Sequence, residues 1–266
     1  MSIRIWANHA HIFQAHLRPN ATVEELLKYI DEAGIEHAVA FAPFPGPQSE
    51  GLADRNEWLA EQLVNRPELT GFGTVDFNAK DISADVAHIA ELGFKGIKIH
   101  PQYQWVAIDG EKMIEACSKA AELGLFVTFH SGVHFSPLKE TAVWLFDSLS
   151  YACPTLRYSM EHVGGYCHFR EALGVILNAA RRREPQRVFA GLTSVFTPGG
   201  WYLSDSDICD LVNIAGEDIP MFGLDFPYNN PEYAKNAIKR ILSLDISDNA
   251  KELILGGNLR RELGYA

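Results

Sequence analysis

The stretch that decides the fold is GLFVTFH, at residues 124–130. Gly124 follows a helical pattern and suits the left-handed residue that commonly ends a helix. Residues 126–129 do not alternate between polar and apolar side chains, which is typical of a strand covered on both faces. His130 stands directly after this run. The stretch therefore predicts a helix end, a buried parallel strand and a polar side chain at the strand's carboxyl end.

The same unit recurs along the chain. Comparable β-branched or apolar runs begin near Ile3, His37, Leu69, Phe94, Leu125, Arg157, Arg187 and Ile219. A polar turn and a helical stretch follow each run, and the mean spacing is about 31 residues, the size of one unit of a (β/α)8 barrel. We therefore predict an α/β fold, a (β/α)8 TIM barrel. It forms a single domain over residues 1–266, with an extra C-terminal helix within 249–265.

Helix boundaries support this division. Thr22 and Glu25 have the spacing of a capping box, Gly34 suits the end of that helix, and Pro231 suits the first turn of the helix after the eighth strand.

A doubly wound open sheet is the alternative fold, but it would place a glycine-rich turn after the first strand. That position holds NHAHIF, residues 8–13, so the sequence favours the barrel.

Composition narrows the class of protein. The 266 residues are 47% apolar and 21% charged, which excludes a disordered chain, and no apolar stretch is long enough to cross a membrane. The net charge of −11 argues against nucleic acid and anionic membrane surfaces as partners. We expect a small-molecule substrate, with a homo-oligomer possible. Four scattered cysteines without a C-x-x-C motif, and an N-terminus unlike a secretory signal, predict reduced thiols in a cytoplasmic protein.

Histidine and aspartate residues stand at several predicted strand ends. Because these ends share one rim of the barrel, His9, His11, His130 and Asp225 are expected to converge there. His9 and His11 are two residues apart on a strand, so both side chains point the same way. Three imidazoles and a carboxylate suit a divalent metal ion. We expect one ion, Zn²⁺ first, with Mn²⁺ or another divalent ion as the alternative.

Asp225 and His162 are the predicted catalytic residues. Asp225 ends an apolar strand, where a buried carboxylate without a cation is unfavourable, so we expect a metal ligand that also acts as a base. Two glycines follow His162 and allow the backbone to approach a substrate. A second metal ligand and a structural histidine remain the alternatives for His162.

Further residues are candidates for substrate contact. His100 and Lys98 share one face of the fourth strand, where a buried lysine needs a partner or bridges two metals as a carboxylated side chain. His134 follows the fifth strand in a loop at the same rim. The aromatic residues that could wall a pocket in these loops are Tyr103, Trp105, Trp201 and Tyr228. We predict substrate contacts from His100, Tyr103, His134 and Tyr228.

Taken in order, these motifs resemble the amidohydrolase superfamily, and within it the amidohydrolase-related branch (amidohydrolase 2) of TIM-barrel metal-dependent hydrolases and decarboxylases. The resemblance runs along the chain through HAH (9–11), GFKGIKIHP (93–101), HSG (130–132), EHVGG (161–165), GLDFP (223–227) and ILGGNLRR (254–261).

The resemblance implies a single-metal site with His9, His11, His130 and Asp225 as ligands. It also implies that His162 orients or protonates the reacting group. This sequence departs from the family pattern beside the first histidine, where the family often has an aspartate and this chain has Asn8. Without that aspartate, a carboxylate that would support the metal ligands is missing.

The predicted function is hydrolysis of a small carbonyl substrate (a lactone, ester or amide, in some cases bearing a carboxylate) by a metal-activated water, with Asp225 taking its proton. The alternative is metal-dependent, non-oxidative decarboxylation of an aromatic or dienoic acid. The short loops favour hydrolysis. A barrel that binds a ligand without turnover around a structural metal is a third possibility, but such a donor set normally leaves a coordination position open. No arginine stands out as a carboxylate clamp.

Overall fold

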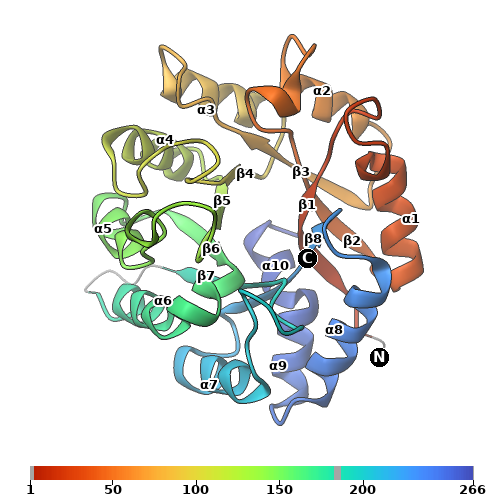
Figure 1. Ribbon diagram of the computed structural model, residues 1–266, viewed down its shortest axis with the longest axis vertical. Coiled ribbons are helices and arrows are strands. Elements are labelled where there is room, and N and C mark those ends of the chain that lie inside the picture. Colours follow the sequence, from red (N-terminus) through yellow and green to blue (C-terminus); the bar gives the residue numbers. More distant parts are fainter. Residues whose placement is uncertain (1–2, 183–186, 266) are drawn as a thin grey trace.

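Eight strands form a closed parallel barrel in the computed structural model, which describes residues 3–182 and 187–265. They pair in chain order, and β1 also pairs with β8 to close the ring (Figure 1). The strands are β1 (Trp6–His11), β2 (His37–Phe41), β3 (Leu69–Thr74), β4 (Gly96–Ile99), β5 (Phe126–His130), β6 (Arg157–Glu161), β7 (Val188–Thr193) and β8 (Pro220–Phe226). The predicted TIM barrel is confirmed.

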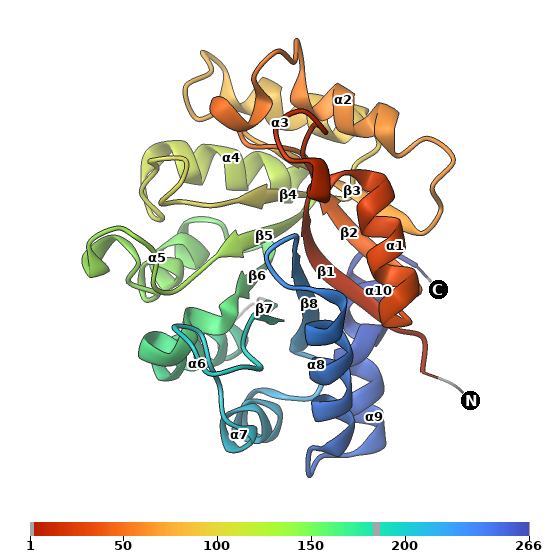
Figure 2. The ribbon, with the colours of Figure 1, turned by 45° about the vertical axis from the view of Figure 1, so that its right-hand side comes forward.

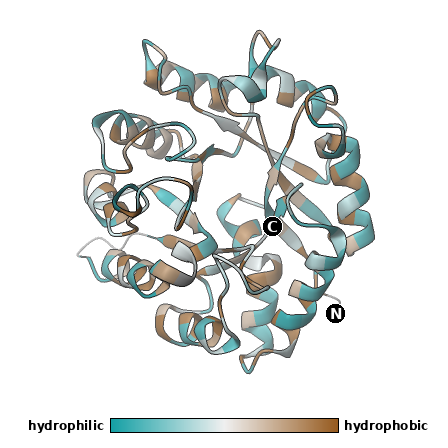
Figure 3. Cartoon of the chain, viewed as in Figure 1, coloured by the Kyte–Doolittle hydropathy of each residue, from teal (hydrophilic) through white to brown (hydrophobic). Residues whose placement is uncertain are grey.

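A helix follows each strand and covers the outside of the barrel. These helices are α1 (Val23–Ala33), α2 (Arg55–Gln62), α3 (Ile82–Glu91), α4 (Glu111–Glu122), α5 (Leu145–Ala152), α6 (Gly165–Ala180), α7 (Asp205–Ala215) and α8 (Pro231–Ser243). Helices α1 and α8 lie side by side, where the first and last units meet (Figures 1 and 2). The outward faces of the helices are mainly hydrophilic (Figure 3), as expected for helices that bury one face on a sheet.

The predicted C-terminal extension is also helical, and it closes one end of the barrel. It consists of α9 (Asp248–Glu252), a π-helical segment (Leu253–Gly257) and α10 (Asn258–Glu262). Leu259 and Leu263 pack with Trp6 in a core cluster. The other members of that cluster are the inward-facing residues Val39, Phe41, Phe72, Phe126, Phe189 and Met221. The barrel interior is therefore filled and closed at its amino end, which leaves the carboxyl end for a site.

Two strands begin two or more residues later than their apolar runs predict. β1 begins at Trp6 rather than near Ile3, because Trp6 is the first residue in register with His37, and their rings stack 3.8 Å apart. β4 begins at Gly96 rather than Phe94. The Phe94 ring instead lies where a side chain on Gly71 would be, so it packs outside the ladder.

The start of α1 forms only half of the predicted capping box. The Thr22 hydroxyl accepts the backbone N–H of Glu25, but the Glu25 carboxylate pairs with Lys28 instead of returning to the backbone. Gly34 ends the helix at φ 69°, as its position predicts. A complete capping box occurs instead at Ser204 and Asp207, at the start of α7.

The four cysteines, which all lie within the described residues, form no disulfide. None of the helices described is both long enough and apolar enough to span a membrane.

Candidate active site and metal centre

The carboxyl ends of the strands surround a cavity of about 720 Å³. The residues predicted as metal ligands, catalytic residues or substrate contacts all line this cavity: His9, His11, His100, Tyr103, His130, His134, His162, Asp225 and Tyr228. The topology explains the convergence, because parallel strands of a closed barrel end at one rim. The structure thus brings the predicted residues together, although this alone does not assign a role to any of them.

Three of the four predicted metal ligands form a compact group. One ligand atom from each of His9, His11 and Asp225 lies within 4.8 Å of the others, and all three residues are buried. His9 Nε2 and Asp225 Oδ1 are 3.6 Å apart. These distances allow one divalent ion to contact all three donors.

His130 lies beside this group and not within it. Its ring stacks on that of His100, with centroids 3.9 Å apart and planes 6° from parallel, and it meets the His162 ring edge to face at 4.7 Å. Its Nε2 is buried and has no hydrogen-bond partner among the described residues. A buried nitrogen without a partner is unfavourable. The donor set therefore fits a metal, with His130 as the candidate fourth ligand.

Glu161, to which the sequence analysis gave no role, supports His9, a candidate metal ligand. Its carboxylate accepts hydrogen bonds from His9 Nδ1, at 3.2 Å, and from Asn8 Nδ2, at 3.0 Å. The hydroxyls of Ser159 and Thr193 also donate to it. Because Nδ1 of His9 carries the proton, its Nε2 keeps a lone pair directed at the candidate metal position. The loss of a carboxylate at Asn8 therefore does not leave His9 unsupported, since Glu161 provides one from β6.

Replacing Glu161 with glutamine is expected to weaken metal affinity by about 10- to 100-fold, because the amide no longer offers two anionic oxygens to the donors around it. Titration of the metal-free protein with Mn²⁺ or Zn²⁺, followed by calorimetry, measures this change. Glu36→Gln is the matched control, because Glu36 forms an exposed pair with Arg4 before β2. Equal metal affinities for Glu161→Gln and the wild type would contradict this role.

Asp225 is held from the side opposite His9. Its Oδ2 accepts the hydroxyl of Ser194 at 2.7 Å, and Asn229 Nδ2 donates to the same hydroxyl at 2.9 Å. Burial raises the pKa of Asp225 to about 6. Asp225 and Ser194 both have φ 59°, a region that costs a residue with a side chain about 1–3 kcal/mol. Strain of this kind concentrates at functional sites.

His162 is fixed in one tautomer. Its Nδ1 lies 2.8 Å from the carbonyl oxygen of Thr193, so Nδ1–H donates and Nε2 carries the lone pair. The ring stacks on Trp201 at 4.3 Å. Burial, and then the charge of Lys98, lowers the pKa of His162 to about 3. A ring with this pKa is neutral near neutral pH and suits a hydrogen-bond acceptor through Nε2, which differs from the protonating role that the family resemblance allowed.

Lys98 lies fully buried beneath the site. Its Nζ is 3.3 Å from His9 Nε2 and 5.3 Å from the centroid of the Phe41 ring. Burial lowers its pKa to about 8, and the charges of Glu161 and Asp225 oppose that shift. The charges of these two carboxylates therefore offset part of the cost of burying the lysine.

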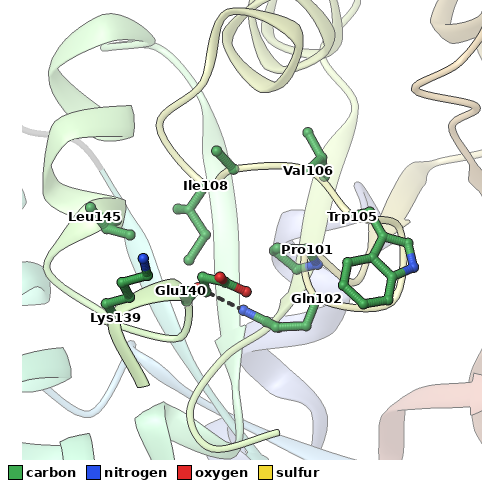
Figure 4. Close-up of a pocket in the computed structure, with 9 residues that line it drawn as sticks. Pro101, Gln102, Trp105, Val106, Ile108, Lys139, Glu140 and Leu145 are labelled. Carbon is green, nitrogen blue, oxygen red and sulfur yellow. Dashed lines mark hydrogen bonds between the residues drawn. The ribbon is translucent and has the colours of Figure 1, made fainter. Parts of the chain in front are cut away.

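Aromatic side chains form the walls of the cavity, with one exception. Tyr103, Trp201 and Tyr228 line it, as the sequence suggested. Trp105 does not: it is 88% exposed and borders a separate cavity of about 440 Å³ beside Gln102 (Figure 4). The interpretation of Trp105 as a wall of the site is wrong, because the loop after β4 turns its side chain away.

The barrel and the donors at its rim define an enzyme of the amidohydrolase superfamily. The chain belongs to the Amidohydro_2 family, whose model, described as amidohydrolase, matches residues 8–264.

Solved structures share this fold at low sequence identity. A 5-carboxyvanillate decarboxylase from Sphingomonas paucimobilis is 16% identical with a TM-score of 0.75, and each chain is covered completely. A dihydroxybenzoic acid decarboxylase from Polaromonas sp. JS666, with bound manganese and the inhibitor 2-nitroresorcinol, is 16% identical with a TM-score of 0.72, covering 99% of this chain and 97% of that one. An uncharacterised TIM-barrel protein from Bordetella bronchiseptica is 19% identical with a TM-score of 0.77, covering 98% of both. No curated protein matches the sequence.

Proposed function

We propose that this chain is a single-domain, metal-dependent decarboxylase acting on a small aromatic or dienoic acid. The observation that carries the proposal is the cavity itself, which has the three-donor group of His9, His11 and Asp225 among its lining residues and Tyr103 and Trp201 in its walls. Such a site suits a planar acid whose carboxylate reaches the donors. The decarboxylases with the same fold support this reading over the hydrolysis that the short loops first suggested.

The ion in this proposal is divalent and would be held by His9, His11, His130 and Asp225. When bound, it would act as a Lewis acid that orients the acidic end of the substrate and withdraws charge from it. The donor set suits Zn²⁺, and the manganese in the Polaromonas enzyme makes Mn²⁺ an equal candidate.

The remaining chemistry is assigned to side chains. Decarboxylation breaks the bond between the carboxylate carbon and the ring or chain carbon, releases CO₂, and leaves an electron pair that takes up a proton. Asp225 is the candidate proton donor, because its carboxyl group lines the cavity beside the other two donors, where the acidic end of the substrate would lie. His162 Nε2 is positioned to accept a hydrogen bond from a substrate hydroxyl, while Trp201 fixes the ring plane of that histidine.

Product analysis tests the proposal. Protein loaded with Mn²⁺ or Zn²⁺ is incubated with hydroxybenzoic acids, dienoic acids and lactones in D₂O, and CO₂ and organic products are measured. We expect CO₂ and a product carrying one deuterium at the carbon that lost it. A hydrolysed or ring-opened acid without CO₂ would establish the hydrolase instead, and binding without any turnover would establish a binding protein.

A further inference from the structure

The turn that follows β6 has a strained backbone. His162, Val163, Gly164 and Gly165 are consecutive, and their φ values of 63°, 48°, 72° and 64° are all positive. A positive φ is unfavourable for a residue with a side chain, so His162 and Val163 need contacts that hold them in this conformation. Because the His162 ring lines the cavity, whatever holds the turn also sets where this ring lies.

One buried hydroxyl joins the two ends of this turn. Ser131 comes directly after β5, and its Oγ–H donates to the carbonyl oxygen of Glu161 at 2.6 Å. The same Oγ accepts the backbone N–H of Gly164 at 2.9 Å. Both bonds are buried, so their loss would leave polar backbone groups without partners. The residue before His162 and the second residue after it are therefore fixed to the end of the neighbouring strand.

The segment after β5 also packs closely against the turn and its aromatic neighbour. A Cβ atom on Gly132 would lie 2.6 Å from the carbonyl oxygen of Gly164, so only glycine fits there. Trp201, which stacks on the His162 ring, donates its Nε1–H to the carbonyl oxygen of Val133 at 3.0 Å. The three residues after β5 thus contact both the backbone of the turn and the indole beside the His162 ring.

We propose that Ser131 is a positioning residue for His162. Its hydroxyl holds the turn so that His162 Nε2 can accept a hydrogen bond from a substrate hydroxyl, while Nδ1–H donates to the carbonyl oxygen of Thr193. Ser131 is not among the residues that line the cavity, so it acts through the backbone. The substrate hydroxyl rests on the proposed function, whereas the effect of Ser131 on the His162 hydrogen bond does not.

The first test needs no substrate. Zn²⁺-loaded protein is labelled with ¹⁵N at histidine, and the Nδ1–H signal of His162 is identified by its absence from His162→Gln. In the wild type this proton is buried and bonded to Thr193. We expect Ser131→Ala to shift the signal and to speed its exchange with water by at least about 10-fold, because the turn opens more often.

The second test measures binding without turnover. Metal-loaded protein is titrated with 2-nitroresorcinol, which has no carboxylate to lose, and with nitrobenzene, which lacks the hydroxyls. We expect the wild type to bind 2-nitroresorcinol at least about 10-fold more tightly, as one or more added hydrogen bonds imply. Ser131→Ala should weaken 2-nitroresorcinol by at least about 5-fold and nitrobenzene by less than about 2-fold.

Ser150→Ala is the matched control, because it removes an equally buried hydroxyl, bonded to the Tyr158 hydroxyl at 2.7 Å behind β6. It should lower Tm and leave the His162 signal and the ligand preference unchanged. If Ser131→Ala does not fold, Ser131→Cys is measured instead, because a thiol keeps a weak donor and acceptor in the same place.

The outcomes separate this inference from the proposed function. An unchanged His162 signal in the folded variant overturns the positioning role, as does an unchanged preference between the two ligands. Equal weakening of both ligands also overturns it, because Ser131 would then support the whole cavity. A changed His162 signal in a protein whose wild type binds neither ligand would support the role of Ser131 while rejecting a hydroxylated aromatic substrate.

Discussion

Asp225→Asn is expected to lower kcat/KM by about 10³-fold or more. The substitution removes the only carboxylate of the three-donor group and the candidate proton donor in one step. The change is nearly isosteric, and the amide oxygen of asparagine can still accept the Ser194 hydroxyl, so the fold should persist. Steady-state kinetics on a substrate from the product screen, with metal content measured by mass spectrometry, tests the prediction.

Asp218→Asn is the control for this experiment. Asp218 is a partly exposed aspartate that pairs with Arg187 before β7 begins, so its substitution should leave both activity and metal content close to those of the wild type. An Asp225→Asn protein that keeps its metal and loses less than about 10-fold in kcat/KM would show that Asp225 is neither an essential ligand nor the proton donor.

Removing the divalent ion with a chelator, followed by buffer exchange, is expected to abolish measurable turnover. Without an ion, His9, His11 and Asp225 can still line the cavity, but no Lewis acid remains there. Adding back Mn²⁺ or Zn²⁺ should restore activity. Because the ion binds the folded state, it should also raise Tm by about 5 °C at a concentration near 100 times its Kd.

The thermal shift separates two explanations for a lost activity. If the chelated protein is inactive, keeps the Tm of the untreated protein and does not regain activity when metal is added, the treatment has damaged the protein. Loss of the metal alone would not explain that result. Full activity after verified metal removal would reject a metal-dependent reaction of either kind.

The order of the strands was predictable because each buried strand can be recognised from its own short stretch of sequence. The residues of β5, for example, do not alternate between polar and apolar side chains, and they follow a helix-ending glycine. Their ends then meet at one rim by topology alone, so His9, His11 and Asp225 could be placed together without knowing any side-chain conformation. Strand starts were less accurate, because an apolar side chain such as Phe94 can pack against a neighbouring strand without joining the ladder.

The supporting residues of the site were not predicted. Glu161 precedes His162 in the sequence, and the argument that a buried carboxylate needs a partner, applied to Asp225, would have identified it equally well. Ser194 offered no such signal, because its contact with Asp225 depends on a loop conformation that no local pattern specifies. The stacking of His130 on His100 likewise depends on side-chain rotamers and not on strand position.

The closure of the barrel floor by Leu259 and Leu263 against Trp6 has a consequence for biosynthesis. Residues from the first strand and from the segment after the eighth unit share one hydrophobic cluster, so a nascent chain on the ribosome cannot complete this cluster until residue 263 has emerged. Truncation before α10 would expose the inner phenylalanines to water at the amino end of the barrel, on the side away from the candidate metal ligands.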